Sequence, residues 1–279
     1  MSLALDTLFG IGSLVLVVVG LFLIFGLLHV INLAHAGLMA VGVYAEVSFR
    51  GHGIPFWPGV LLSALVAGAV GALVEIVVIR RLYARPLDTI LATWGVSLVV
   101  IQCITLVYGP GNRFLDLPTT SASSVLGTQY STYRLLLILL GAGIVLGLGV
   151  LVRFTGVGLT VRAVMTNEPL ARSHGINTVR TRQITFIVGA AFAGAAGALL
   201  GPIQGIDPNF GATAVASAFL AVLLAGRTIP GLVLSTVLLG ATQTLFSRYA
   251  NPIWASAVVI GIAVVLLRVL PEGLSFRRA

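Results

Sequence analysis

Long apolar runs make up most of this sequence, and short segments rich in arginine, proline and polar residues separate them. The runs cover approximately 8–30, 31–49, 56–79, 89–107, 135–152, 184–203, 213–226, 231–246 and 254–270. A helix needs about 20 residues to cross the hydrocarbon core of a bilayer, and most of the runs approach that length. Because 213–226 and 231–246 are shorter, we expect half-helices or a broken pair there. The pattern predicts an all-α, polytopic membrane protein of about eight or nine transmembrane helices, some short or broken, in a single transmembrane domain over residues 1–279.

The arginines divide unevenly between the two sides that these helices define. The positive-inside rule assigns the richer side to the cytoplasm. That side holds Arg80, Arg81, Arg85, Arg153, Arg162, Arg172, Arg180, Arg182, Arg227, Arg268, Arg277 and Arg278, and the other side holds Arg50, Arg113, Arg134 and Arg248. Counting back predicts an external N-terminus with nine crossings. A re-entrant bend near Asn32 to His35 would instead leave eight crossings and an internal N-terminus.

Composition narrows the chemistry that the chain can perform. Only 9% of residues are charged against 58% hydrophobic, so the outer face must meet lipid, and the net charge of +8 is explained by topology without nucleic-acid binding. All 16 basic residues are arginine, which excludes a P-loop lysine and therefore a Walker-type ATPase site. The single cysteine, Cys103, excludes internal disulfides and CxxC motifs. No nucleophile–base pair or metal-ligand cluster is visible, so we expect neither an enzyme nor a metal site.

The cytoplasmic segment 153–183 contains signals for a short helix. Asn167 is a good N-cap, Pro169 suits a first turn, and Gly175 can end the helix in the left-handed conformation. We expect a helix over about 168–174, with Leu170 and Ala171 as its apolar face. It is either a docking helix that inserts into a groove on a cytoplasmic partner or an ordinary connection between two membrane helices.

Several polar and small residues within the apolar runs are candidates for a structural or a functional role. Asn32 and His35 are spaced to share a helix face directed into the bundle, where they form either a structural kink or part of a polar pathway. Glu46 is placed to pair with Arg50, and Glu75 lies close to Arg80. The pattern Gly197-x-x-x-Gly201 favours close helix packing, within the chain or against a second permease.

Several motifs resemble one family of transport proteins, the permease subunits of ABC importers for branched-chain amino acids and related small amides. The resemblance covers nearly the whole chain. Its motifs are Ile31-Asn-Leu-Ala-His-Ala-Gly37, Leu91-Ala-Thr-Trp-Gly-Val-Ser-Leu98 followed by Gln102 and Tyr108-Gly-Pro110, then Arg162-Ala163, Asn167, Ala171 and Gly175-Ile176, the small residues of 186–197, and Arg268-Val-Leu-Pro-Glu-Gly-Leu274. The segment Ala225-Gly-Arg-Thr-Ile-Pro-Gly231 departs from the family by having fewer glycines and an added charge.

The resemblance implies a permease subunit that moves branched-chain amino acids across the bacterial cytoplasmic (inner) membrane, without an ATPase site of its own. Two ABC ATPase subunits would bind the ATP, a second homologous permease would complete a heterodimer or homodimer, and an extracytoplasmic binding protein would deliver substrate. The implied coupling residues are Arg162, Ala163, Asn167, Glu168, Leu170, Ala171, Arg172, Gly175 and Ile176, and the implied pathway residues are Asn32, His35, Thr93, Ser97 and Gln102.

Two alternatives stay open at this point. The same type of importer could carry urea or short-chain amides, because nothing in the chain distinguishes these substrates from branched-chain amino acids. A self-contained secondary transporter or channel belongs to a different class. The absence of a deeper ladder of acidic residues argues against proton or sodium coupling, which would need titratable groups near the midplane.

Overall fold

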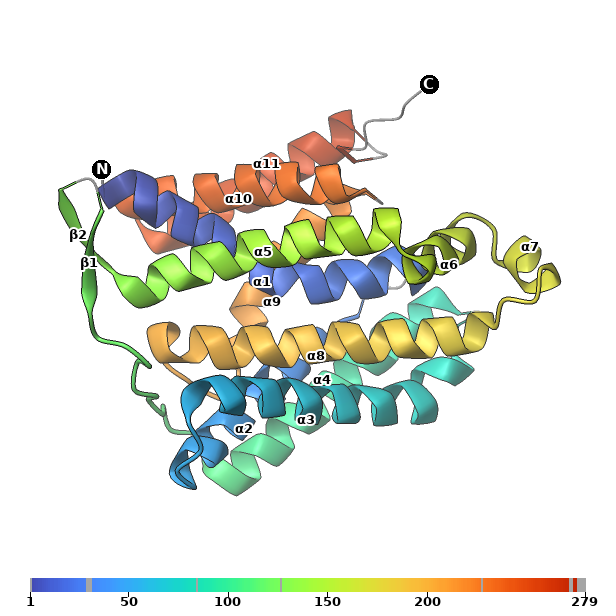
Figure 1. Ribbon diagram of the computed structural model, residues 1–279, viewed down its shortest axis with the longest axis horizontal. Coiled ribbons are helices and arrows are strands. Elements are labelled where there is room, and N and C mark those ends of the chain that lie inside the picture. Colours follow the sequence, from blue (N-terminus) through green and yellow to red (C-terminus); the bar gives the residue numbers. More distant parts are fainter. Residues whose placement is uncertain are drawn as a thin grey trace. The chain divides into compact units, whose positions relative to one another are not determined.

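The computed structural model, drawn in Figure 1, describes residues 2–28, 32–83, 85–125, 127–226, 228–270 and 273–274. The chain divides into two compact units. Unit 1 combines residues 1–18, 116–146 and 216–279, and unit 2 combines residues 19–115 and 147–215. Several positions named above lie outside the described residues, namely Ile31, Arg227, Pro271, Glu272, Arg277 and Arg278.

Helices account for nearly all of the regular structure in the described residues. They are α1 (Ser2–Leu28), α2 (His35–Gly51), α3 (Phe56–Val77), the 3-10 turn η1 (Ile79–Arg81), α4 (Pro86–Tyr108), α5 (Thr132–Phe154), α6 (Gly156–Thr166), α7 (Glu168–Ser173), α8 (Thr178–Gln204), α9 (Phe210–Ala225), α10 (Ile229–Tyr249) and α11 (Pro252–Val269). Within the described ranges, six helices are long and apolar enough to cross a membrane, and α9 and α11 are shorter apolar helices. The all-α, multi-pass prediction is confirmed.

Three local predictions need correction. Helix α10 extends over 21 residues and is not a half-helix, because it begins two residues before the apolar run 231–246 and continues three residues beyond it, whereas α9 is indeed short at 16 residues. Helix α6 was not predicted; it begins where the Thr155 side chain accepts a hydrogen bond from Gly158 N–H. The external segment contains an unpredicted hairpin in which β1 (Ala122–Val125) pairs antiparallel with β2 (Thr128–Ser131).

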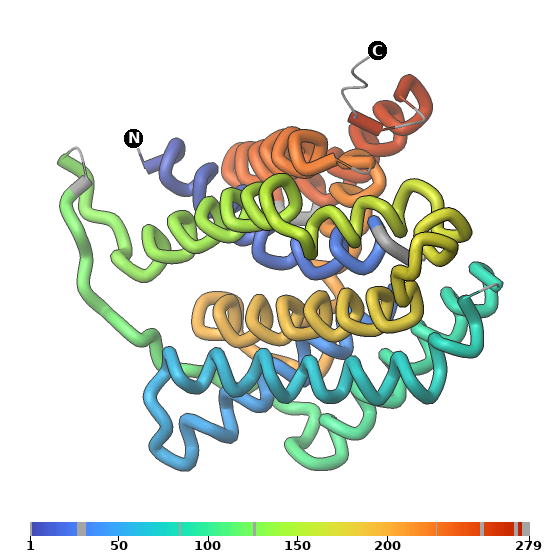
Figure 2. Tube along the Cα trace, turned by 45° about the vertical axis from the view of Figure 1, so that its right-hand side comes forward, coloured from blue at the N-terminus to red at the C-terminus, as the bar shows by residue number. Residues whose placement is uncertain are grey.

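Close helix contacts through glycine organise unit 2. Helices α3 and α8 lie side by side and antiparallel, as Figures 1 and 2 show, and a Cβ added to Gly71 would come within 2.3 Å of Ala190 Cβ. Helix α2 crosses α8 at Gly42 and Gly194, where the two backbones touch. Because lipid provides no hydrophobic force between helices, such small residues permit the dispersion contacts that hold them together. Within this unit, the Gly197-x-x-x-Gly201 pattern therefore packs against α2 of the same chain.

Helix α2 runs parallel to α4 with a constant offset in register. Leu33 N–H donates to Thr93 Oγ1 at 3.2 Å, Gly37 N–H donates to Ser97 Oγ at 3.2 Å, and the Ser48 and Tyr108 hydroxyls also bond. Thr93 lies about two turns after the start of α4 at Pro86. At a rise of about 1.5 Å per residue, the segment that leads into α2 therefore lies roughly 10 Å from the start of α4. The turn before His35 is thus a bend inside the bundle, not the middle of a continuous helix.

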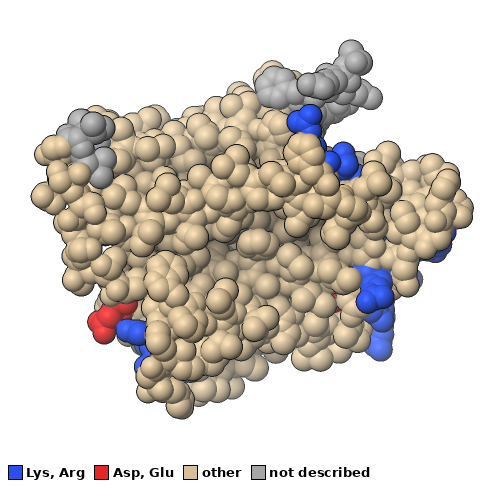
Figure 3. Space-filling view, in the orientation of Figure 1, with Lys and Arg blue, Asp and Glu red and all other residues tan. Residues whose placement is uncertain are grey.

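Buried carboxylates in unit 2 find different partners. Glu46 is fully buried and accepts a hydrogen bond from Ser63 Oγ at 3.3 Å, so the predicted pairing with Arg50 is wrong, and Arg50 bonds to the Ile54 carbonyl. Glu75 does pair with Arg80, at 3.5 Å from its Nε. In the space-filling view, the bodies of α3 and α8 show no band of charged atoms (Figure 3). Such a surface suits contact with lipid tails.

Candidate functional site

Helix α7 is short but well defined at both ends. Asn167 Oδ1 accepts a hydrogen bond from Leu170 N–H at 3.1 Å, which confirms the predicted N-cap. At the other end Gly175 has φ +82°, Gly175 N–H bonds to Arg172 O, and Ile176 N–H bonds to Ala171 O. This pair of bonds is a Schellman motif, which satisfies carbonyls that the last turn would leave free. A six-residue helix needs such caps, because propagation alone does not stabilise so short a segment.

The two apolar residues of α7 differ in their surroundings. Ala171 is only 5% exposed and packs with Val164 of α6, while Leu170 is 54% exposed. Ile176 packs against the same small cluster. The prediction that Leu170 and Ala171 form one face is therefore wrong. Ala171 holds α7 to α6, and Leu170 projects outward from the segment.

Ionic contacts join α7 to the start of α8. Glu168 pairs with Arg172 at 3.2 Å through one carboxylate oxygen and with Arg182 through the other. The Arg182 guanidinium lies 4.8 Å from the centre of the Tyr83 ring, and Tyr83 Oη donates to buried Glu75 at 2.9 Å. Burial and the neighbouring Glu75 carboxylate raise the pKa of Tyr83, which stays neutral and keeps donating. A continuous set of contacts thus runs from α7 to the end of α3.

A pocket of about 670 Å³ opens beside these contacts. Its lining is Tyr83, Glu168, Pro169, Arg172, Ser173 and Arg182. Of the other predicted coupling residues, Arg162 lies exposed on α6, with Nε directed to the Gly158 carbonyl, and Ala163 packs against the α6–α7 cluster. The structure therefore brings most of the predicted coupling residues into one projecting segment.

Four of the five predicted pathway residues meet at the start of α2. Asn32, His35, Thr93 and Ser97 are all buried. Asn32 precedes the helix, and its Oδ1 accepts from Ala34 N–H at 3.1 Å, so Asn32 and His35 do not share a helix face as predicted. Thr93 and Ser97 accept backbone N–H groups of the same segment. These hydrogen bonds hold the bend in place, which supports the interpretation of Asn32 and His35 as a structural kink.

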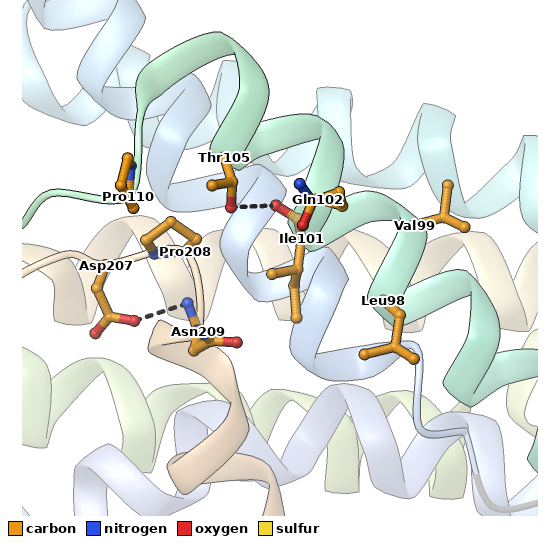
Figure 4. Close-up of a pocket in the computed structure, with 9 residues that line it drawn as sticks. All are labelled: Leu98, Val99, Ile101, Gln102, Thr105, Pro110, Asp207, Pro208 and Asn209. Carbon is orange, nitrogen blue, oxygen red and sulfur yellow. Dashed lines mark hydrogen bonds between the residues drawn. The ribbon is translucent and has the colours of Figure 1, made fainter.

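Gln102, the fifth residue, lines an open pocket of about 650 Å³ on unit 2 (Figure 4). Helix α4 contributes Leu98, Val99, Ile101, Gln102 and Thr105, and Pro110, Asp207, Pro208 and Asn209 complete the lining. A backbone bridge between Arg113 and Ile206, with N–O distances of 2.7 and 3.0 Å, fixes the 205–209 segment next to the end of α4. Helix α4 supplies five of the nine lining residues, and the other four come from the segments that follow α4 and α8.

The sequence motifs named above do not include Asp207 and Asn209, which also line this pocket. The structure places them in the turn between α8 and α9, where they line the pocket together with side chains from the second half of α4. The Asp-Pro-Asn sequence is a helix-start signal that could have indicated this sharp reversal. Among the residues that the structure describes, no group of three His, Cys, Asp or Glu side chains could hold a metal ion.

Comparisons with known proteins agree on one family. The chain matches the permease component of the branched-chain amino acid transport system over residues 3–267. It is 28% identical to the high-affinity branched-chain amino acid transport system permease protein LivH of Salmonella typhimurium, over 93% of this chain and 90% of that protein. The corresponding LivH of Escherichia coli is 29% identical over the same shares.

A second kind of permease also matches. LivM of Salmonella typhimurium, likewise named a high-affinity branched-chain amino acid transport system permease protein, is 27% identical over 91% of this chain and 66% of its own length. No solved structure matches the chain. The family match spans all the apolar helices from α1 to α11. The chain therefore belongs to the family of permease components of branched-chain amino acid transport systems and is a multi-pass membrane protein.

Proposed function

We propose that this chain is the translocation subunit of an ABC importer that moves branched-chain amino acids across a bacterial cytoplasmic membrane. Two separate ATPase subunits bind the ATP, a second homologous permease completes the pathway, and an extracytoplasmic binding protein delivers the substrate. The names of the LivH relatives support the substrate class. The match to LivM, a different permease of the same transport system, supports a heterodimer of two permeases.

The observation that carries the proposal is the capped helix α7 with its outward leucine. Caps at Asn167 and Gly175 hold the helix rigid, and packing of Ala171 on α6 fixes its position. Leu170 then has no described neighbour in the α6–α7 cluster, and its side chain is available to a groove on an ATPase subunit.

The contacts that lead away from α7 supply a route for mechanical coupling. Arg182 binds Glu168 on α7 and stacks on Tyr83, so displacement of α7 acts directly on the start of α8. Tyr83 in turn bonds to Glu75 at the end of α3. Because α3 and α8 pack along each other, both helices move when this end is displaced.

Leu170→Glu in the reconstituted complete importer tests the docking role. We expect ATPase copurification and leucine uptake to fall, while the melting temperature of the permease stays unchanged, because the side chain is outside the packed cluster. The matched control is Leu117→Glu, which changes an exposed leucine in the segment between α4 and α5. This control should leave uptake intact. Ala171→Trp should instead lower stability, because Ala171 is buried.

Three results would overturn the proposal in different ways. Normal ATPase binding and uptake by Leu170→Glu would remove the docking role. Uptake by this chain alone, driven by an ion gradient, would identify a secondary transporter. Import of urea or short amides without import of leucine by the wild-type complex would assign the other substrate class.

A further inference from the structure

The pocket between α4 and the 207–209 segment combines one carboxylate with an apolar wall. Leu98, Val99 and Ile101 supply aliphatic surface from α4, and Asp207 belongs to the segment on the other side of the pocket, where its carboxylate turns toward Asn209 (Figure 4). Its volume of about 650 Å³ leaves ample room for a single amino acid and water. The polar groups of Gln102 and Thr105 lie on the same wall as the aliphatic side chains.

The Asp207 carboxylate has no cationic partner among the described residues. In the described part of the chain, the acidic residues that form ion pairs are Asp6, Glu75, Asp88 and Glu168. Arg113, which the backbone bridge brings to the same segment, is engaged elsewhere, because its Nη2 donates to the Tyr108 carbonyl at 2.7 Å and its guanidinium stacks over the Tyr108 ring. No described cation within ion-pair distance therefore competes with a ligand for the Asp207 carboxylate.

Asp207 also has a structural role that does not require its charge. Asp207 Oδ1 accepts a hydrogen bond from Asn209 N–H at 2.7 Å, and the Asp207 carbonyl accepts one from Phe210 N–H, so the residue shapes the turn that starts α9. An asparagine side chain offers the same oxygen to such a turn. The turn therefore accounts for a short polar residue at position 207 but does not require that residue to be a carboxylate.

We propose that this pocket is a transit site for a zwitterionic α-amino acid with a branched aliphatic side chain, in which Asp207 accepts the ammonium group. The aliphatic side chain of the ligand packs on Leu98 and Ile101, and the Gln102 amide donates to its carboxylate. The proposal rests on the proposed function and adds the chemistry of recognition within the membrane. Urea and neutral amides carry no ammonium group, so the Asp207 carboxylate selects against them.

Ligand binding to the complete transporter in nanodiscs, without its binding protein, tests the proposal. Saturation-transfer NMR with L-leucine reports occupancy, and the competitors are 3-methylbutylamine, which lacks the carboxylate, and 4-methylpentanoate, which lacks the ammonium group. We expect the amine to compete and the acid not to compete. Asp207→Asn should weaken leucine binding about 10- to 100-fold, the range for losing one charge-assisted hydrogen bond.

Matched variants separate the charge from the turn. Asp207→Asn keeps the turn and removes the charge, whereas Asp207→Ala removes both, and Asp116→Asn changes an exposed aspartate elsewhere on the chain. The proposal requires Asp207→Asn and Asp207→Ala to lose binding alike and Asp116→Asn to keep it.

The outcomes distinguish this site from the overall function. Leucine binding that is unchanged in Asp207→Asn but lost in Asp207→Ala would assign Asp207 to the turn alone and overturn the site. Equal competition by the acid and the amine would do the same. Either result leaves the proposed function standing if the wild-type importer takes up leucine, whereas a wild-type importer that takes up no branched-chain amino acid would refute the function itself.

Discussion

The crossing of α2 and α8 makes a quantitative prediction about Gly42. A Cβ added there would lie 2.1 Å from Gly194 O and 2.3 Å from Gly194 Cα, where ordinary contact begins at 3.4 Å. The two backbones would have to separate by 3.4 − 2.3 = 1.1 Å to 3.4 − 2.1 = 1.3 Å to admit one methyl group. Because both atoms are backbone, no side-chain rotation can relieve the contact.

The expected cost of Gly42→Ala follows from this geometry. Overpacking typically costs about 1–3 kcal/mol, and a contact between two backbones belongs at the upper end of that range. The gain in helix propensity from glycine to alanine returns at most about 1 kcal/mol. At roughly 2–4 °C per kcal/mol for a chain of this order of size, we expect the melting temperature to fall by several degrees.

Gly95→Ala provides the matched control. Gly95 also lies within a helix, α4, but nothing is within 4 Å of an added Cβ, so only the propensity gain applies. Thermal unfolding of both purified variants in the same detergent, followed by tryptophan fluorescence, measures the difference. If Gly42→Ala melts at the wild-type temperature or above the Gly95→Ala variant, the close α2–α8 crossing does not exist and the reasoning fails.

Two further predictions concern the loops. Asn167→Ala removes the N-cap of α7 and should cost about 1 kcal/mol of local helix stability, seen as faster amide exchange in α7 and less uptake per ATP, whereas Asn167→Asp should retain both. In unit 1, burial and the bond to Asp6 raise the pKa of Tyr130 to about 12, from an ordinary 10.0. The folded state therefore holds this proton more tightly, and its contribution to stability, complete below pH 10, is lost as the pH rises towards 12. Ultraviolet titration measures the ionisation of the tyrosines, and we expect Tyr130→Phe to lack an absorbance increase that the wild type shows near pH 12. If the variant instead lacks an increase near pH 10, Tyr130 titrates like an exposed tyrosine and the argument from burial is wrong.

The predicted coupling segment shows which signals act locally. Asn167, Pro169 and Gly175 are cap residues whose preferences depend on the few backbone groups beside them, so the bounds of α7 could be predicted. The direction of Ala171 could not, because it depends on α6, whose residues carry no comparably clear pattern.

Asn32 and Asp207 show a different limit. Asn32 was expected to share a helix face with His35, and no sequence motif indicated that Asp207 lines a pocket. The position of each depends on a neighbour distant in sequence: Leu33 N–H bonds to Thr93 Oγ1, and Ile206 bridges to Arg113. No local pattern contains such pairings.

The sequence by itself determined the membrane location, the helical class, nearly all the helix positions and the family, because lipid requires every backbone polar group to be satisfied within a helix. The apolar runs contain almost no charged residues, so they are expected to lie in lipid, where a helix satisfies all their backbone hydrogen bonds. Only the tertiary structure decided that α2 begins inside the bundle, that Leu170 and not Ala171 projects outward, and that Asp207 lines a pocket with aliphatic side chains of α4. The reason is that these features depend on which small residues allow two distant backbones to touch, and a sequence shows the glycines but not their partners.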